Sequence, residues 1–237
     1  MIGGVSRPRV TLKLATSLDG RIATASGESK WITGEAAREQ THRLRAMHLA
    51  VLVGVETAIA DDPALTVRLP GFVAEQPTRV VLDSRQRLPL TSQLVTEARR
   101  LDTLVISATE PRPRLTDAGV TVVQVADSDG RVDPAAALQA IDAYLKDKLR
   151  RLHPSGGAFE TEGSVMIEGG GQVAASFIEA GLVDAVEWFR APIVLGDEGR
   201  PAVAAFVVKE LARAPRLRRT GVRELGADLW ESYEVVR

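Results

Sequence analysis

The chain has 237 residues, 45% of them hydrophobic, and a formal net charge of −1. This length fits one large domain or two small ones, and the near-zero charge gives no overall field that would attract nucleic acid or an anionic membrane. The absence of cysteine excludes disulfides, thiolate nucleophiles and cysteine-ligated metals, and the histidines His42, His48 and His153 lack metal-ligand spacing.

The start of the chain lacks the apolar core of a signal peptide, and no apolar run approaches the ~20 residues of a membrane helix. We therefore expect a cytoplasmic protein that needs no metal.

Strand and helix patterns alternate along the chain, separated by turns rich in Ser, Thr, Asp and Gly. Asp133 and Pro134 have the residue types of a helix N-cap and first helical position. In chain order we expect a strand at 10–15, a helix at 35–47, a strand at 49–53, a helix at 56–60, strands at 79–82, 103–107 and 120–125, a helix at 134–151, a strand at 164–168, a helix at 172–180, a strand at 184–190 and two strands after residue 215, the last at 229–235.

This order predicts an α/β fold with a mainly parallel central sheet, flanking helices and antiparallel C-terminal edge strands. Residues 1–237 are expected to form a single domain. The segment 153–163, HPSGGAFETEG, has the composition of a flexible loop.

The first strand carries a lysine, Lys13, between two leucines. A lysine in that position is costly to desolvate unless an anionic or polar ligand meets it. The alternative is a side chain that reaches solvent, and Asp19 beside Gly20 has the alternative of an ordinary turn residue. The small polar loop 26–29 leads to Trp31, which could form a wall for a flat ring ligand.

The run Glu168-Gly169-Gly170-Gly171-Gln172 follows an apolar strand and opens a helix. A strand–glycine–helix arrangement lets a phosphate approach the backbone N–H groups of a helix N-terminus, although the glycine spacing is not that of the Rossmann fingerprint. The alternative is a tight turn with close packing.

Two further segments could bind ligands. Asp61-Asp62-Pro63 reads as a helix end and turn, because no other carboxylate or histidine supports a metal there. Arg38, His42 and Arg45 share one helical face, which could be a solvated basic face. Arg68 has the guanidinium that grips a phosphate in bidentate fashion.

Four segments carry a resemblance to a known family: TLKLATSLDGRIATASGESKWIT at 11–33, ADDPALTVR at 60–68, VLDS at 81–84 and IEGGG at 167–171. In this order they resemble the reductase domain of bacterial riboflavin biosynthesis proteins, the C-terminal half of a bifunctional deaminase–reductase. The resemblance covers nearly the whole chain. It implies a dihydrofolate-reductase-like fold and a homodimer, for which the apolar segment 202–208 is a candidate interface or else core.

The resemblance also implies roles for individual residues. It places Lys13, Asp19 and Glu168 in the catalytic site. The positions that match substrate contacts are Ser29, Arg45, Leu65, Arg68 and Glu168. Those that match contacts of NADPH are Ala15, Trp31, Thr57, Asp61, Ser84, Gly170, Gly171, Gln172 and Val173. We add the hypothesis that Arg85 and Arg87 bind the 2′-phosphate of NADPH; ordinary surface charge is the alternative.

The implied activity is NADPH-dependent reduction of 5-amino-6-(5-phosphoribosylamino)uracil, with hydride transfer to ribose C1′ and conversion of the ribosyl group to ribityl. Lys13, Asp19, Glu168 or a bound water could supply the proton. Three alternatives stay open: a reductase of the 2-amino precursor, a reductase of a pterin-like ring, and a non-catalytic NADP-binding protein. The zinc deaminase signature requires cysteines that this chain lacks, so we expect either a stand-alone reductase or a fragment of a longer product.

Overall fold

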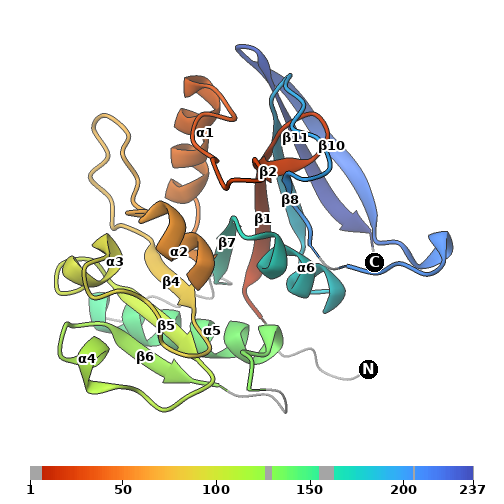
Figure 1. Cartoon of the computed structure of the whole chain (residues 1–237). Helices are drawn as coiled ribbons and strands as arrows, with labels where there is room; N and C mark the ends of the chain where they lie inside the picture. The colour runs from red at the N-terminus through yellow and green to blue at the C-terminus, as the bar shows by residue number, and fades with distance from the viewer. Residues whose placement is uncertain (1–6, 126–129, 155–162, 205, 237) are drawn as a thin grey trace. The chain divides into compact units, whose positions relative to one another are not determined.

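The computed structural model describes residues 7–125, 130–154, 163–204 and 206–236 (Figure 1). They form two compact units. Unit 1 contains Met47–Thr66, Ala74–Val165 and the start of the chain up to Arg9, and unit 2 contains Val10–Ala46, Val67–Val73 and the chain from Met166 onward. The single domain expected from the sequence stays a prediction. Most of the expected loop at 153–163, and residue 205 of the segment 202–208, lie outside the described residues.

Unit 1 is built on four parallel strands: β3 (Ala50–Gly54), β4 (Thr78–Leu82), β5 (Thr103–Ser107) and β6 (Thr121–Gln124), paired in that order. Strands β3 to β5 are almost wholly buried, and each has an apolar centre, although β4 also buries Arg79. The helices are α2 (Val55–Asp61), α3 (Gln93–Thr96), α4 (Pro113–Thr116) and α5 (Pro134–Leu152). Helix α5 begins as expected, because the Asp133 side chain accepts a hydrogen bond from Ala136 N.

Unit 2 contains β1 (Arg9–Thr16) from Val10 onward, and this strand pairs in parallel with β8 (Ala185–Arg190). Strand β11 (Asp228–Val236) pairs antiparallel with β8 and with β10 (Arg216–Leu225), and β10 and β11 form the long ribbon in Figure 1. The helices are α1 (Glu35–Ala46), α6 (Gly171–Glu179) and the 3-10 turn Leu211–Arg213. Two short strands, β2 (Arg21–Ala23) and β9 (Arg200–Pro201), pair with each other.

The division between the units falls within β7 (Ser164–Glu168). The α/β class, the mainly parallel strands and the antiparallel C-terminal strands expected from the sequence are confirmed. No helix among the described residues is long and apolar enough to cross a membrane.

Candidate active site

Three charged side chains form a cluster in unit 2: Lys13 on β1, Arg45 in the last turn of α1 and Glu168 at the end of β7. Arg45 donates from Nε to Glu168 Oε1 at 2.6 Å and from Nη2 to Oε2 at 2.8 Å. Each of these two side chains is only 11% exposed. The pair is therefore a buried, bidentate, charge-assisted contact.

This contact decides the charge of Glu168. Burial by itself raises the pKa of the carboxyl, but the charge and hydrogen bond of Arg45, with the charges of Lys13 and His42, outweigh it. The pKa of Glu168 consequently lies below its ordinary value. With both oxygens bonded to Arg45, Glu168 is an anion at neutral pH and has no proton to donate.

The environment of Lys13, in contrast, favours the uncharged form of its side chain. Burial lowers the pKa of its amine, the nearby charge of Glu168 raises it and that of Arg45 lowers it, and the net pKa is below the ordinary lysine value. The Nζ atom lies 5.5 Å from the ring centroid of Phe189. Of the three expected catalytic residues, Lys13 is the one whose environment favours release of a proton.

Asp19 lies on the surface with partners of its own. Ser17 Oγ donates to its Oδ1 at 2.5 Å, and the backbone N–H groups of Leu195 and Gly196 donate to the carboxylate at 3.1 and 2.8 Å. These hydrogen bonds, that of Ser17 first, lower the pKa of Asp19 to about 2. The carboxylate joins the turn after β1 to residues 195–196, an arrangement that favours a positioning role over proton donation.

The glycine turn presents backbone N–H groups at the start of α6. Gly169 and Gly170 have φ values of +74° and +85°, which glycine adopts without strain. The first backbone bond of α6 runs from Ala174 N to Gly170 O, so the N–H groups of residues 171–173 have no acceptor within the helix and suit an anion.

Gly171 also shows the close packing considered as the alternative. A Cβ atom there would lie 2.4 Å from Pro201 O, and Ala204 N donates to Gly171 O at 3.0 Å. The last glycine of the turn is therefore required by its own unit, whatever the turn binds. Gln172 is exposed and Val173 half-buried at the start of the helix.

Trp31 has the exposure expected of a ring-binding wall. The residue is 73% exposed, its φ is +73°, and the Arg38 guanidinium lies 4.3 Å from the ring centroid. Arg38 also donates to Thr33 O at 2.9 Å, which holds it over the ring. Ser29 is half-buried in the same loop.

Arg68 approaches α1 through its backbone. Its N–H donates to His42 Nδ1 at 3.3 Å, and His42 lies one turn before Arg45 on the same helical face. The Arg68 side chain is exposed, whereas Arg45 is buried and paired with Glu168. A clamp of both arginines on one phosphate stays a prediction, and the arginine–carboxylate pair is a contact that the sequence did not indicate.

Four expected site residues belong to unit 1: Thr57 and Asp61 on α2, Leu65 after it, and Ser84 after β4. Leu65 is buried with a φ of +53°, and its neighbour Asp62 ends α2 with a φ of +40°. Such backbone persists only where the surroundings hold it, and it is frequent at functional sites.

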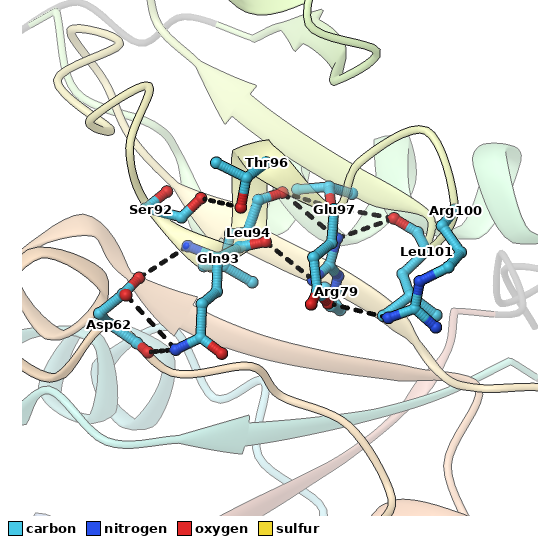
Figure 2. A network of polar contacts seen from close by, with 10 residues as sticks. Asp62, Arg79, Ser92, Gln93, Leu94, Thr96, Glu97, Arg100 and Leu101 are labelled. Carbon is cyan, nitrogen blue, oxygen red and sulfur yellow. Dashed lines mark hydrogen bonds and ion pairs between the residues drawn. The ribbon is translucent and has the colours of Figure 1, made fainter.

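A polar network holds this strained segment (Figure 2). Gln93 donates from its backbone to Asp62 Oδ1 at 2.8 Å and from Nε2 to Asp62 O at 2.6 Å. The buried Arg79 donates to Leu94 O at 3.3 Å and Leu101 O at 2.8 Å. Asp62, which the sequence analysis treated as a turn residue, is thus the anchor of the segment that carries Asp61 and Leu65.

Two of the residues that follow β4, Ser84 and Arg87, also have polar partners within unit 1. Ser84 Oγ accepts from Val132 N at 3.2 Å, and Arg87 pairs with Glu56 at 2.5 Å across exposed side chains. Arg85 is exposed. Arg87 therefore shares its charge with a carboxylate, which weakens the hypothesis that it binds a 2′-phosphate.

Sequence reasoning missed Phe189, which lies beside Lys13, and Trp230, which stacks on Phe189. Their rings stack with centroids 5.7 Å apart and an interplanar angle of 2°. Aromatic residues in two late strands were the available signal, but which strands pair cannot be read from one sequence. In the described part of the chain, no group of three or more His, Cys, Asp or Glu side chains could hold a metal ion.

Comparison with known proteins identifies the family of this chain. A sequence model described as the RibD C-terminal domain matches residues 8–230. The riboflavin biosynthesis protein RibD of Actinobacillus pleuropneumoniae is 34% identical over 234 residues, which are 97% of this chain and 57% of that protein. The chain thus spans little more than half the length of this relative.

A second relative matches over its full length. The 2,5-diamino-6-ribosylamino-4(3H)-pyrimidinone 5′-phosphate reductase of Methanothermobacter thermautotrophicus is 35% identical over 97% of this chain and 99% of that protein. Among solved structures, Acinetobacter baumannii RibD is similar with a TM-score of 0.79 and 32% identity, over 98% of this chain and 59% of that one. The chain therefore belongs to the RibD C-terminal domain family.

Proposed function

We propose that this protein is an NADPH-dependent reductase of riboflavin biosynthesis that acts on 5-amino-6-(5-phosphoribosylamino)uracil. The observation that carries the proposal is the cluster of the half-buried Lys13 with the buried pair of Arg45 and Glu168, in a chain whose relative matched over its full length is named as a pyrimidine reductase. A nicotinamide cofactor is implied by that family, and its preference for NADPH over NADH is part of the proposal.

The chain's own residues divide the work. A bound nicotinamide supplies the hydride, and the protein supplies position and electrostatics. Residues 170–173 hold the pyrophosphate at the start of α6, and Trp31 covers a flat ring. The remaining cofactor contacts that we propose are Ala15, Thr57, Asp61 and Ser84.

We assign substrate contacts to Ser29, Leu65, Arg68 and the Arg45–Glu168 pair. When hydride reaches ribose C1′, the C1′–O4′ bond breaks and the ring oxygen takes a proton. Lys13 is the group that we propose holds and releases that proton, since Glu168 and Asp19 are anions at neutral pH.

The 2-amino precursor is a second candidate substrate, favoured by the name of the Methanothermobacter relative. NADPH oxidation by the purified protein, with each pyrimidine offered separately, decides between the two. Turnover of the uracil that Lys13→Met abolishes supports the proposal. Turnover of the precursor alone moves the enzyme to that substrate, and inhibition by folate analogues indicates a pterin-like ring.

Tight NADPH binding without turnover of either pyrimidine identifies a non-catalytic NADP-binding protein. Substitution of NADH in the same assay tests the cofactor preference. We further propose that the protein is a cytoplasmic homodimer that binds neither nucleic acid nor membrane. Sedimentation of the purified protein tests the dimer.

A further inference from the structure

Four side chains form a row across four strands of unit 2, and Lys13 stands at one end of it. The Lys13 Nζ atom lies 5.5 Å from the centroid of the Phe189 ring. The Phe189 ring stacks on the Trp230 ring with centroids 5.7 Å apart. The guanidinium of Arg223, on β10, lies 5.4 Å from the Trp230 ring centroid. The candidate proton source is thus linked to an aromatic stack that no step proposed so far uses.

Strand register produces the row. Ala15 on β1 is paired with Phe189 on β8, Phe189 with Trp230 on β11, and Trp230 with Arg223 on β10. Lys13 precedes Ala15 by two residues and therefore lies on the same face of β1. Phe189 is fully buried, so its ring cannot turn away from the lysine to solvent.

A hydrogen bond to Glu187 holds the Trp230 ring in the stack. Its Nε1 donates to Glu187 Oε2 at 2.6 Å, and Ser232 Oγ donates to the same oxygen at 2.6 Å. Glu187 is the register partner of Lys13, and one of its oxygens is taken by these two donors. This carboxylate therefore holds the ring stack together as well as lying beside the lysine.

Several charges act around the lysine. Glu168 on β7 favours the ammonium and Arg45 on α1 opposes it. Glu187 on β8 is paired in register with the lysine. His42 on α1 acts through Glu168. Burial disfavours the charged form most strongly. The face of an aromatic ring attracts a cation within ~6 Å of its centroid, and more strongly where water is excluded.

We propose that Phe189, backed by Trp230, is a positioning residue that holds the Lys13 ammonium over its ring face and keeps it protonated until the ring oxygen of the substrate needs the proton. This inference rests on the proposed function of Lys13. The ring offsets part of the burial penalty on the charge, so that the amine is neither fixed as a cation, as in a tight carboxylate pair, nor neutral before substrate binds.

The test replaces Phe189 with phenylalanine carrying one, two or three fluorine atoms, introduced at that codon alone. Fluorine withdraws charge from the ring face while it keeps the ring's shape, so the fold is retained. The readout is competitive acetylation of Lys13 by acetic anhydride across pH, measured by mass spectrometry on the protein without cofactor or substrate.

We expect the pH of half-maximal labelling to fall with each fluorine. Loss of a cation–π contact of the usual strength corresponds to labelling about two- to tenfold faster at a fixed pH below the midpoint. Lys146, which pairs with Asp142 on α5, serves as the internal reference in every sample. The matched control is the same fluorine series at Phe177, an equally buried ring on α6.

Equal labelling of Lys13 across the Phe189 series, or the same change in the Phe177 series, overturns the inference. Because this readout needs no turnover, it is separate from the proposed function. A protein that follows the labelling prediction but oxidises NADPH with neither pyrimidine refutes the function alone. Turnover of a pyrimidine with labelling unaffected by fluorine refutes the role of Phe189 alone.

Discussion

The Arg45–Glu168 pair allows a prediction in which the two partners are unequal. Glu168→Gln leaves two cations, Arg45 and Lys13, with no carboxylate between them. Arg45→Met leaves Glu168 with Lys13 still acting on it. Breaking one side of a buried pair destabilises a protein by about 3–5 kcal/mol, and at 11% exposure solvent screens little of it. We therefore expect about 5 kcal/mol for Glu168→Gln and about 3 kcal/mol for Arg45→Met.

Tryptophan fluorescence during urea unfolding measures these values with a signal from unit 2, since all three tryptophans, Trp31, Trp188 and Trp230, lie in it. The double variant Arg45→Met/Glu168→Gln completes a thermodynamic cycle. Because neither buried charge of the pair is then left alone, we expect a coupling free energy of about 2–3 kcal/mol. An unchanged slope against urea is the control that the denatured state is the same.

Additive single effects, or an Arg45→Met variant as unstable as Glu168→Gln, would refute this account of the cluster. The pH dependence supplies a second check. The pKa of Glu168 is lowered by folding, so its contribution is complete above the unfolded value of ~4.3 and is lost as pH falls through the folded value. The stability difference between wild type and Glu168→Gln should therefore shrink below about pH 4.

Three further predictions concern the same two units. Lys13→Met should abolish NADPH oxidation and yet raise the melting temperature at neutral pH, because the lowered pKa of Lys13 means that its charged form destabilises the fold; a lower melting temperature contradicts this. The contribution of Asp19 is present above its unfolded pKa of ~3.9 and is lost as pH falls toward about 2, so Asp19→Asn should flatten the acid unfolding curve, and Ser17→Ala should do so in part. Gln93→Ala removes the side-chain hydrogen bond to Asp62 O, with an expected loss of stability of about 1 kcal/mol. It should raise the KM for NADPH more than it changes kcat. A fall in kcat with an unchanged KM would argue against a positioning role.

Long elements with a clear period were predictable from the sequence. The alternation in β1 reflects buried Val10, Leu12 and Leu14 on one face, and the cap at Asp133 forms as its residue type indicates. The elements that were missed are short: β2, β9, α3 and α4 have two to four residues each. A segment of that length has no period, and it forms because a distant partner holds it, as β9 does for β2.

In the candidate site, too, the residue types were predictable from the sequence, but their contacts with residues far away in the chain were not. Arg45 and Glu168 were each identifiable, but the bond between them joins residues 123 positions apart. The sequence predicted Arg45 as a substrate contact and Glu168 as a catalytic and substrate residue, but it did not pair them. Phe189 lies close to Lys13, and Trp230 stacks on Phe189, only through strand pairing. Residue chemistry was therefore readable from the chain, whereas the partners that set each charge were not.

The packing of Gly171 against Pro201 O affects how variant libraries of this family should be interpreted. A substitution there displaces a neighbouring backbone, so it will score as deleterious even in an assay of expression or solubility with no nucleotide present. Depletion at Gly171 is therefore no measure of nucleotide affinity. The exposed Gln172, one position further on, is a proposed cofactor contact, and there a scan would test recognition of the cofactor separately from assembly of the protein.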